Sequence, residues 1–189
     1  SDLTKLYLGF LLDGSGSINK YDPGNYKKCL GFVKGLARAF PNSKIGAIVF
    51  SYQSELQFDF HQYTNPADIQ TAIDGFKYPG HSTYTGKGLK MAKERLFKGV
   101  TKGIPRVLIV ITDGKSHDDV IIPSEELKQS GVIVLSVGVG KRFNKAELYI
   151  VASNPKEKHV FTVDFSQMSN IITAIQQLAC KGKYKLFRY

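Results

Sequence analysis

Short apolar runs recur along the chain at the length of β-strands. Those over 107–111 and 132–139 are almost entirely aliphatic, as is typical of parallel strands buried on both faces. Residues 55–60 instead alternate between apolar and polar side chains, which is the pattern of a half-exposed edge strand. Only Gln53 and Ser54 separate this strand from the run before it, so we expect a hairpin. The predicted strands cover residues 6–12, 45–52, 55–60, 107–111, 132–139 and 159–163.

Helical patterns lie between these runs. In the first, apolar side chains recur at helical spacing, and Asp22-Pro23 supplies an N-cap and a first-turn proline. The predicted helices cover residues 23–40, 66–76, 85–96, 123–129, 144–152 and 166–180. Alternation of strands and helices predicts an α/β fold: a doubly wound, Rossmann-like sheet, mostly parallel with one antiparallel edge strand and helices on both faces.

The chain has 189 residues, of which 42% are hydrophobic, and this suits one globular domain. We expect that domain over residues 1–180, followed by a basic C-terminal tail over 181–189. No apolar run approaches the roughly 20 residues that span a bilayer, so membrane insertion is not expected. Cys29 and Cys180 both fall in helical patterns. Their expected offset along the helices argues against a disulfide, although the sequence leaves both states open.

The net charge of +10 favours anionic partners. The excess is concentrated over residues 87–106, where seven cationic side chains stand against Glu94 alone, and in the tail. Acidic proteins, sulfated glycans and acidic polymers all fit this charge, as does an ordinary solvated helix face. No nucleic-acid-binding motif accompanies the basic residues, so nucleic acid is not an expected partner.

The most informative motif is Asp13-Gly14-Ser15-Gly16-Ser17, directly after the first predicted strand. One carboxylate and two hydroxyls on alternate residues can face a single hard cation, while the glycines let the backbone curl around it. Ligands of open α/β sheets bind at the carboxyl ends of the strands, where this loop lies. The motif therefore predicts a divalent-metal site.

Two further loops are expected at the same edge of the sheet. Thr83 lies in the segment 82–86 before a predicted helix, and Asp113 follows the buried strand in the sequence Ile-Thr-Asp-Gly. Together the three loops would supply two carboxylates and three hydroxyls. Singly, each residue could be a helix cap or a turn former, but convergence of all five favours a metal site.

This combination of motifs resembles the von Willebrand factor type A domain, and the resemblance covers about residues 6–180. It implies that the family's metal-ion-dependent adhesion site falls on Asp13, Ser15, Ser17, Thr83 and Asp113. The hydroxyls would bind the ion directly and the aspartates often through water. The implied ion is Mg²⁺, with Mn²⁺ or Ca²⁺ as alternatives, and the chain departs from many relatives at Gly80-His81-Ser82, where they carry a small glycine-rich run.

By the same resemblance, the chain is a non-enzymatic, extracellular adhesion module. It would bind matrix proteins, collagens among them, through a partner carboxylate that completes the metal shell. Residues at or near this face form a second, less specific set of candidate ligand contacts. They are His81 and Tyr84, which flank Thr83, and the lysines of the following helix, Lys87, Lys90, Lys93 and Lys98.

Two other classes of function were weighed. A phosphoryl-transfer enzyme with Asp13 as nucleophile would need a second carboxylate two residues on, where the chain has Ser15. The sequence also lacks a G-x-S-x-G nucleophile elbow and a complete dinucleotide fingerprint, so no enzymatic activity is expected. The alternative of an intracellular type A domain in a larger assembly stays open, although the intact metal motif favours the extracellular branch.

The resemblance also implies a conformational switch in which the last helix, over 166–180, slides along the sheet when ligand binds. Its apolar stripe of Ile171, Ile175 and Leu178 would move between pockets. Truncation after Phe165 is then expected to change ligand affinity or stability. Wild-type binding and stability in that variant would rule the switch out.

Overall fold

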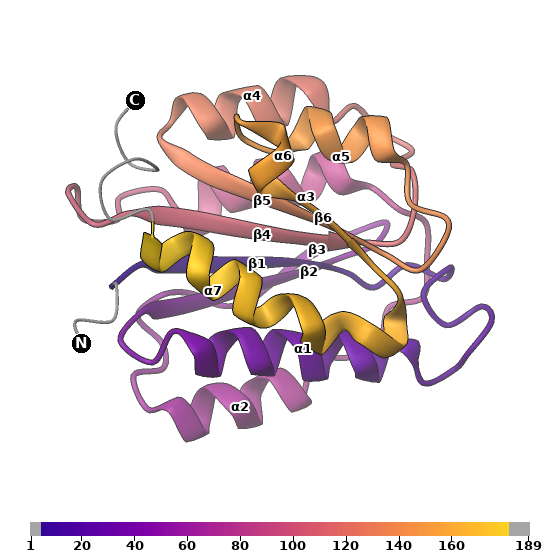
Figure 1. The fold of residues 1–189 in the computed structure, drawn as a ribbon, viewed down its shortest axis with the longest axis horizontal. Coiled ribbons are helices and arrows are strands. Elements are labelled where there is room, and N and C mark those ends of the chain that lie inside the picture. Colours follow the sequence, from indigo (N-terminus) through magenta and orange to yellow (C-terminus); the bar gives the residue numbers. More distant parts are fainter. Residues whose placement is uncertain (1–4, 182–189) are drawn as a thin grey trace.

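The computed structural model describes residues 5–181, with the side chains of the last two residues left aside. A six-stranded sheet in the order β3-β2-β1-β4-β5-β6 forms its centre (Figure 1). All neighbouring strands are parallel except the β2–β3 pair, which is the predicted hairpin at the sheet edge. The strands are β1 Tyr7–Asp13, β2 Lys44–Phe50, β3 Ser54–Phe58, β4 Arg106–Thr112, β5 Val132–Val139 and β6 Val160–Val163.

The strand order reverses direction between β1 and β4, which are direct neighbours in the sheet. From β1 the chain moves outward to β2 and β3, and from β4 it moves outward on the other side to β5 and β6. The crevice at such a switch point is where doubly wound sheets bind ligands. Asp13 ends β1 and Asp113 directly follows β4, so both acids of the predicted metal motif lie at this point.

Helices cover both faces of the sheet, as predicted, with α1, α2 and α7 on one side and α3, α4 and α5 on the other (Figure 1). No helix among the described residues is long and apolar enough to cross a membrane. The helices are α1 Asn25–Ala39, α2 Pro66–Asp74, α3 Thr85–Met91, η1 Ala92–Leu96, α4 Ile121–Gln129, α5 Lys145–Val151, α6 Lys156–His159, η2 Phe165–Ile171 and α7 Ile172–Lys181.

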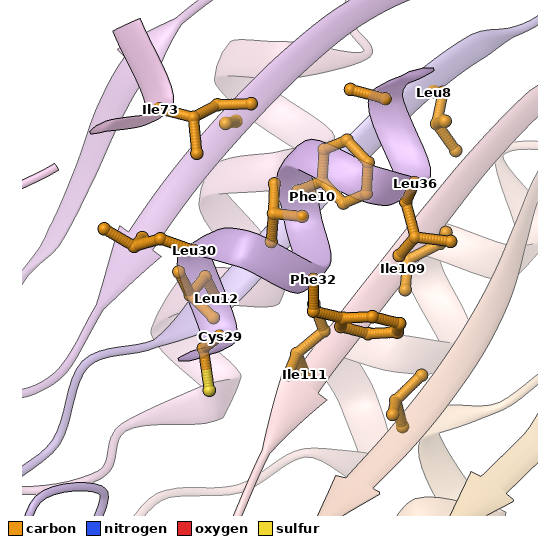
Figure 2. Close-up of a cluster of buried hydrophobic side chains, with 14 of the residues drawn as sticks. Leu8, Phe10, Leu12, Cys29, Leu30, Phe32, Leu36, Ile73, Ile109 and Ile111 are labelled. Atoms are coloured by element: carbon orange, nitrogen blue, oxygen red, sulfur yellow. The ribbon is translucent and has the colours of Figure 1, made fainter. Parts of the chain in front are cut away.

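The two faces of β1 pack into two separate cores. Leu8, Phe10 and Leu12 point toward α1, where they meet Cys29 and Leu36 among other buried side chains (Figure 2). The intervening residues face α3 and η1 on the other side of the sheet. Cys29 is a free cysteine whose thiol is buried in this core.

Several predicted helices differ from the structure in detail. The helix over 85–96 is α-helical only to Met91 and continues as the π-helix η1, and the last helix begins as the 3₁₀ segment η2. The first helix starts at Asn25 after an N-cap at Gly24, so Asp22 is not its N-cap. Its carboxylate Oδ1 instead accepts a hydrogen bond from the Gly24 amide at 2.7 Å. Hydrophobic spacing cannot distinguish these helix types, because their periods differ by less than a residue per turn.

Candidate metal centre

Asp13 is fully buried at the end of β1, and both of its carboxylate oxygens are held. The Ser15 amide donates to Oδ1 at 2.8 Å, and the Thr112 hydroxyl donates to Oδ2 at 2.7 Å. Thr112 reaches this position because β1 and β4 are adjacent and in parallel register. The acid is therefore oriented jointly by its own loop and by the neighbouring strand.

A chain of hydrogen bonds joins the serines to the second acid. The hydroxyls of Ser15 and Ser17 lie 3.0 Å apart, and Ser17 Oγ donates to Asp113 Oδ1 at 2.8 Å. The Tyr78 hydroxyl donates to the Ser15 carbonyl at 2.7 Å and so holds the backbone of the loop that carries both serines. Four of the five predicted ligands are thus brought into one connected cluster.

The fifth, Thr83, is buried and placed by main-chain bonds of its loop to both neighbouring loops. On one side the Gly16 amide donates to the His81 carbonyl at 2.8 Å, and the Gly80 amide donates to the Gly14 carbonyl at the same distance. On the other, the His117 amide donates to the Thr83 carbonyl at 2.8 Å. The three loops predicted to converge are therefore pinned side by side.

The glycines of the motif are required by close approach to the neighbouring loop. A Cβ on Gly14 would lie 2.6 Å from Pro79 Cδ, and one on Gly16 would lie 2.8 Å from the Gly80 carbonyl oxygen. Neither glycine has positive φ. Their role is thus to admit the loop that carries Thr83, rather than to permit an unusual backbone conformation.

Burial disfavours the charged form of both carboxyl groups. Burial raises the pKa of Asp13 above its ordinary value despite the hydrogen bonds that favour the ionised form. Burial, and then the nearby charge of Asp13, raises the pKa of Asp113 to about 7. Among the described residues, no Lys, Arg or His forms an ion pair with either acid.

These features fit a divalent cation. The clustered side chains offer only carboxylate and hydroxyl oxygens, the donors that Mg²⁺ and Ca²⁺ prefer. Within the part of the chain that the structure describes, no group of three or more His, Cys, Asp or Glu side chains is arranged to hold a metal ion by itself. A cation at this position would supply the charge that two buried, unpaired carboxylates lack.

Sequence reasoning missed a supporting network behind the site. Asp118 accepts from the Gly86 and Lys87 amides, both at 2.8 Å, and so caps α3 just after Thr83. Ser116 donates its hydroxyl to Asp118 at 2.5 Å, while the carboxylate of Glu147 on α5 accepts from the Ser116 amide at 3.0 Å. The adjacency of Asp118 to the Asp113 motif was the available signal, but its partners are about thirty residues away.

The predicted rim residues are spread more widely. His81 is exposed next to Thr83, and Tyr84 stacks on His117 with ring centroids 5.8 Å apart. Lys87 lies 4.6 and 4.7 Å from the ring centroids of Tyr52 and Tyr84, so it belongs to this rim. The remaining lysines lie farther along the helix, with Lys90 and Lys98 exposed and Lys93 paired to Glu126 at 3.2 Å.

The family model of the von Willebrand factor type A domain matches residues 8–177, nearly all of the described chain. The chain belongs to this family. Its type A domain is 35% identical over 178 residues to mouse vitrin, and 32% identical over 183 residues to mouse matrilin-2. These matches cover 92% and 93% of this chain, but only 27% and 19% of the two relatives. The chain therefore spans about a quarter or less of these relatives.

Among solved structures, the chain is similar to proximal thread matrix protein 1 from the mussel byssus. Its structure superposes with a TM-score of 0.85 at 32% identity, covering 94% of this chain and 46% of the mussel chain. A second structure of the same mussel protein has zinc in its metal-ion-dependent adhesion site (MIDAS) motif, and it also superposes on this chain with a TM-score of 0.85. A divalent metal thus occupies the adhesion-site motif in a close structural neighbour.

Proposed function

We propose that this type A domain is a non-enzymatic adhesion module that binds protein ligands through a divalent metal ion. The ion is held by the five residues of the sheet-edge cluster, Asp13, Ser15, Ser17, Thr83 and Asp113. The observation that carries the proposal is the pair of buried carboxylates, 0% and 3% exposed, with no cationic partner among the described residues. The proposed ion is Mg²⁺, with Mn²⁺ and Ca²⁺ as alternatives that the same oxygen donors accept.

The mixed donor set explains how the ion serves adhesion. Hydroxyl ligands are neutral, so a site with three of them leaves part of the ion's charge available to another acid. A Glu or Asp of the partner completes the coordination, and the bond is strong because the ion is partly desolvated. Asp13 and Asp113 keep the ion in the domain, while the serine and threonine hydroxyls orient it.

We propose extracellular matrix proteins, collagens among them, as the partners, and the extracellular space as the location. A solved neighbour is named as a matrix protein and carries metal at the motif, which supports this proposal. The decisive test is solid-phase binding to triple-helical collagen and to a panel of matrix proteins, with Mg²⁺ or with EDTA. Binding to none of them in Mg²⁺ would overturn the choice of partner.

The metal site itself is tested by calorimetric titration of chelator-stripped protein with Mg²⁺, Mn²⁺ and Ca²⁺. One-to-one binding is expected in the wild type and is expected to be lost in Asp13→Asn, which keeps the side-chain shape. Asp74→Asn is the matched control, because that acid is exposed on α2 and pairs with Lys34. Equal binding by the wild type and Asp13→Asn would place the ion elsewhere.

A second candidate function is binding of sulfated glycans or acidic polymers through the basic side of α3 and η1. Exposure of Lys87, Lys90 and Lys98 favours it, whereas the ion pair between Lys93 and Glu126 weakens the contribution of Lys93. Retention on a heparin column is expected to fall when Lys90, Lys93 and Lys98 are changed together to Glu. Unchanged retention would reject this surface.

A further inference from the structure

A cavity of about 410 Å³ opens directly beside the metal centre. Ser17 and Asp113 form part of its lining, so the cavity and the metal cluster share a wall. Its other walls come from the segment before α1, from the loop between β5 and α5, and from the segment after β6. Their main side chains are Tyr21, Lys141, Arg142, Asp164 and Phe165.

Cationic side chains gather around one exposed ring at the mouth of this cavity. Tyr21 is a large aromatic residue, yet it is 64% exposed to solvent. The guanidinium carbon of Arg142 lies 4.2 Å from the centroid of that ring, and Arg142 also donates to the Tyr21 hydroxyl. Lys20 approaches the same ring, with Nζ 5.6 Å from its centroid. Tyr21 therefore acts as a platform that orients Arg142 before any ligand arrives.

These cations are not neutralised within the described residues. The ion pairs there involve Lys28, Lys34, Lys93 and Lys128, and none involves Lys20, Lys141 or Arg142. Asp164 is the one acid that lines the cavity besides Asp113. Three cations stand against this acid at the mouth, so an incoming anion is attracted.

We propose that the cavity is a second anion subsite, which takes an acidic side chain of the partner next to the acid that completes the metal shell. The inference rests on the proposed function and deepens it, because it assigns the partner a motif of two acids. Since Ser17 and Asp113 line both sites, one short segment of the partner reaches both. The Arg142 fork, with one donor used by Tyr21, keeps further N–H groups for a carboxylate.

An acidic protein segment suits the cavity better than a sulfated sugar. Apolar surface from Val139, Phe165 and the Tyr21 ring lies beside the cations. The methylene groups of a glutamate can pack on this surface while its carboxylate reaches Arg142 or Lys141. The hydroxyl-rich face of a sugar would instead lose hydrogen bonds to water there.

The test uses two fluorescent peptides, one with a single Glu among glycines and one with two Glu separated by one to three glycines. Binding is measured by anisotropy in Mg²⁺ and in EDTA, for the wild type, Lys141→Gln, Arg142→Gln and the control Lys145→Gln. Lys145 is a matched control, since it is exposed on α5 and lies over Tyr149 outside the cavity. Metal affinity without peptide is measured for each variant.

In Mg²⁺ the wild type is expected to bind the two-acid peptide about ten times more tightly than the one-acid peptide. Arg142→Gln removes most of this preference, Lys141→Gln part of it and Lys145→Gln none, while one-acid and metal affinities stay unchanged. Equal affinity of the wild type for both peptides, or a preference that survives in Arg142→Gln, overturns the subsite alone.

Two other outcomes reach further. If neither peptide binds with Mg²⁺ present, the proposed function falls and the subsite falls with it. A heparin oligosaccharide is the competing arm of the experiment. If it binds in EDTA and its affinity drops in Arg142→Gln, the cations serve a sulfated glycan instead, and the two-acid motif is rejected.

Discussion

The two buried acids of the metal centre are supported unequally. Asp13 is held by a backbone amide and by the Thr112 hydroxyl, whereas Asp113 accepts its side-chain hydrogen bond from Ser17. Ser17 is itself a proposed metal ligand, and its hydroxyl can bind an ion through oxygen while it still donates its proton to Asp113. Fewer hydrogen bonds favour the charge of Asp113 than favour that of Asp13. Asp113 is therefore the acid whose charge depends most on the cation.

This imbalance predicts opposite effects of one substitution on stability and on binding. Asp113→Asn keeps an acceptor for Ser17 but removes one of two charges that repel each other in a buried site. In EDTA, we expect its free energy of unfolding to rise by roughly 1 kcal/mol, about the value of one pKa unit. Thermal denaturation checks the gain, and titration with Mg²⁺ is expected to show that binding is lost. A less stable variant in EDTA would mean that the charge is already balanced without metal.

The contact between Gly16 and the Gly80 carbonyl predicts a substitution that lowers both stability and metal affinity. In Gly16→Ala, the new Cβ would lie 2.8 Å from a backbone oxygen, which cannot move away as a flexible side chain could. We expect a loss of about 1–3 kcal/mol in stability and weaker metal binding, as the Thr83 loop is pushed away. Chemical denaturation and calorimetry measure both.

The matched control is Gly31→Ala, in the interior of α1, where an added Cβ meets nothing within 4 Å. That variant is expected to gain up to about 1 kcal/mol from helix propensity and to keep metal affinity. If Gly16→Ala behaved in the same way, close approach of the two loops would not be the reason for that glycine.

At the scale of elements, α3 depends on a cap that comes from another part of the chain. Its own N-cap residue, Tyr84, makes no side-chain cap, and Asp118 accepts from the first amides of the helix instead. By contrast, α4 is capped locally, since Asp119 accepts from the Ile121 and Ile122 amides at 3.0 and 3.2 Å. The two neighbouring aspartates thus perform the same task for different helices.

This pair allows a direct comparison. Asp118→Ala and Asp119→Ala are each expected to lower the free energy of unfolding by about 1–2 kcal/mol, the usual cost of a lost cap. Only Asp118→Ala is expected to weaken Mg²⁺ binding, because α3 follows Thr83 directly and its start would shift. Equal metal affinities in the two variants would show that the Thr83 loop is positioned independently of α3.

The π-helix η1 shows why some elements escape sequence prediction. The Phe97 amide donates to the Ala92 carbonyl at 2.8 Å, and this hydrogen bond closes the wider turn of the π-helix. Leu96, at the end of this turn, packs on the sheet. There Leu96 lies against Gly9 and Gly46, which are paired on adjacent strands and leave room for it. Helical periodicity in the sequence predicts a helix in this segment. It does not predict the π-turn, because the packing of Leu96 depends on glycines that are distant in sequence.

For the whole molecule, burial of His159 predicts a pH dependence of stability. The side chain is 1% exposed, and burial, followed by Lys156 and Lys158, holds its pKa below the ordinary value of 6.5. As the pH falls through 6.5, His159 is protonated in the unfolded chain but stays neutral in the folded domain. The contribution of His159 to stability is therefore lost on the acid side, with a slope of at most about 1.4 kcal/mol per pH unit, whereas Asp113, whose pKa is raised to about 7, contributes with the opposite sign over the same range.

Urea unfolding in EDTA between pH 5 and 7.5 measures this slope. His159→Phe is expected to remove the His159 contribution, so that the wild type loses more stability than this variant as the pH falls, whereas His81→Gln at an exposed position is expected to follow the wild type. Parallel pH profiles of the wild type and His159→Phe would assign the pH dependence to other groups.

The overall architecture was accessible from sequence because its signals are local. Apolar runs identified the strands, and the placement of Asp13 and Asp113 after two of them predicted that both acids lie at one edge of the sheet. The supporting contacts of Thr112, Asp118 and Glu147 were not accessible, because each joins residues about thirty or more positions apart. The cationic platform at Tyr21 was missed for the same reason, since Arg142 reaches it from the far half of the chain.

The directions of β1 and α7 have a mechanical consequence. β1 runs from Tyr7 toward the candidate metal edge. The segment η2 begins at Phe165 in the cavity wall and leads into α7, which runs back over ten residues, about 15 Å, to Lys181 (Figure 1). The described chain therefore enters β1 and leaves α7 at the pole opposite the candidate metal site. In a string of such domains, the candidate metal face would point away from the connections, and tension along the string would enter each domain through β1 and α7.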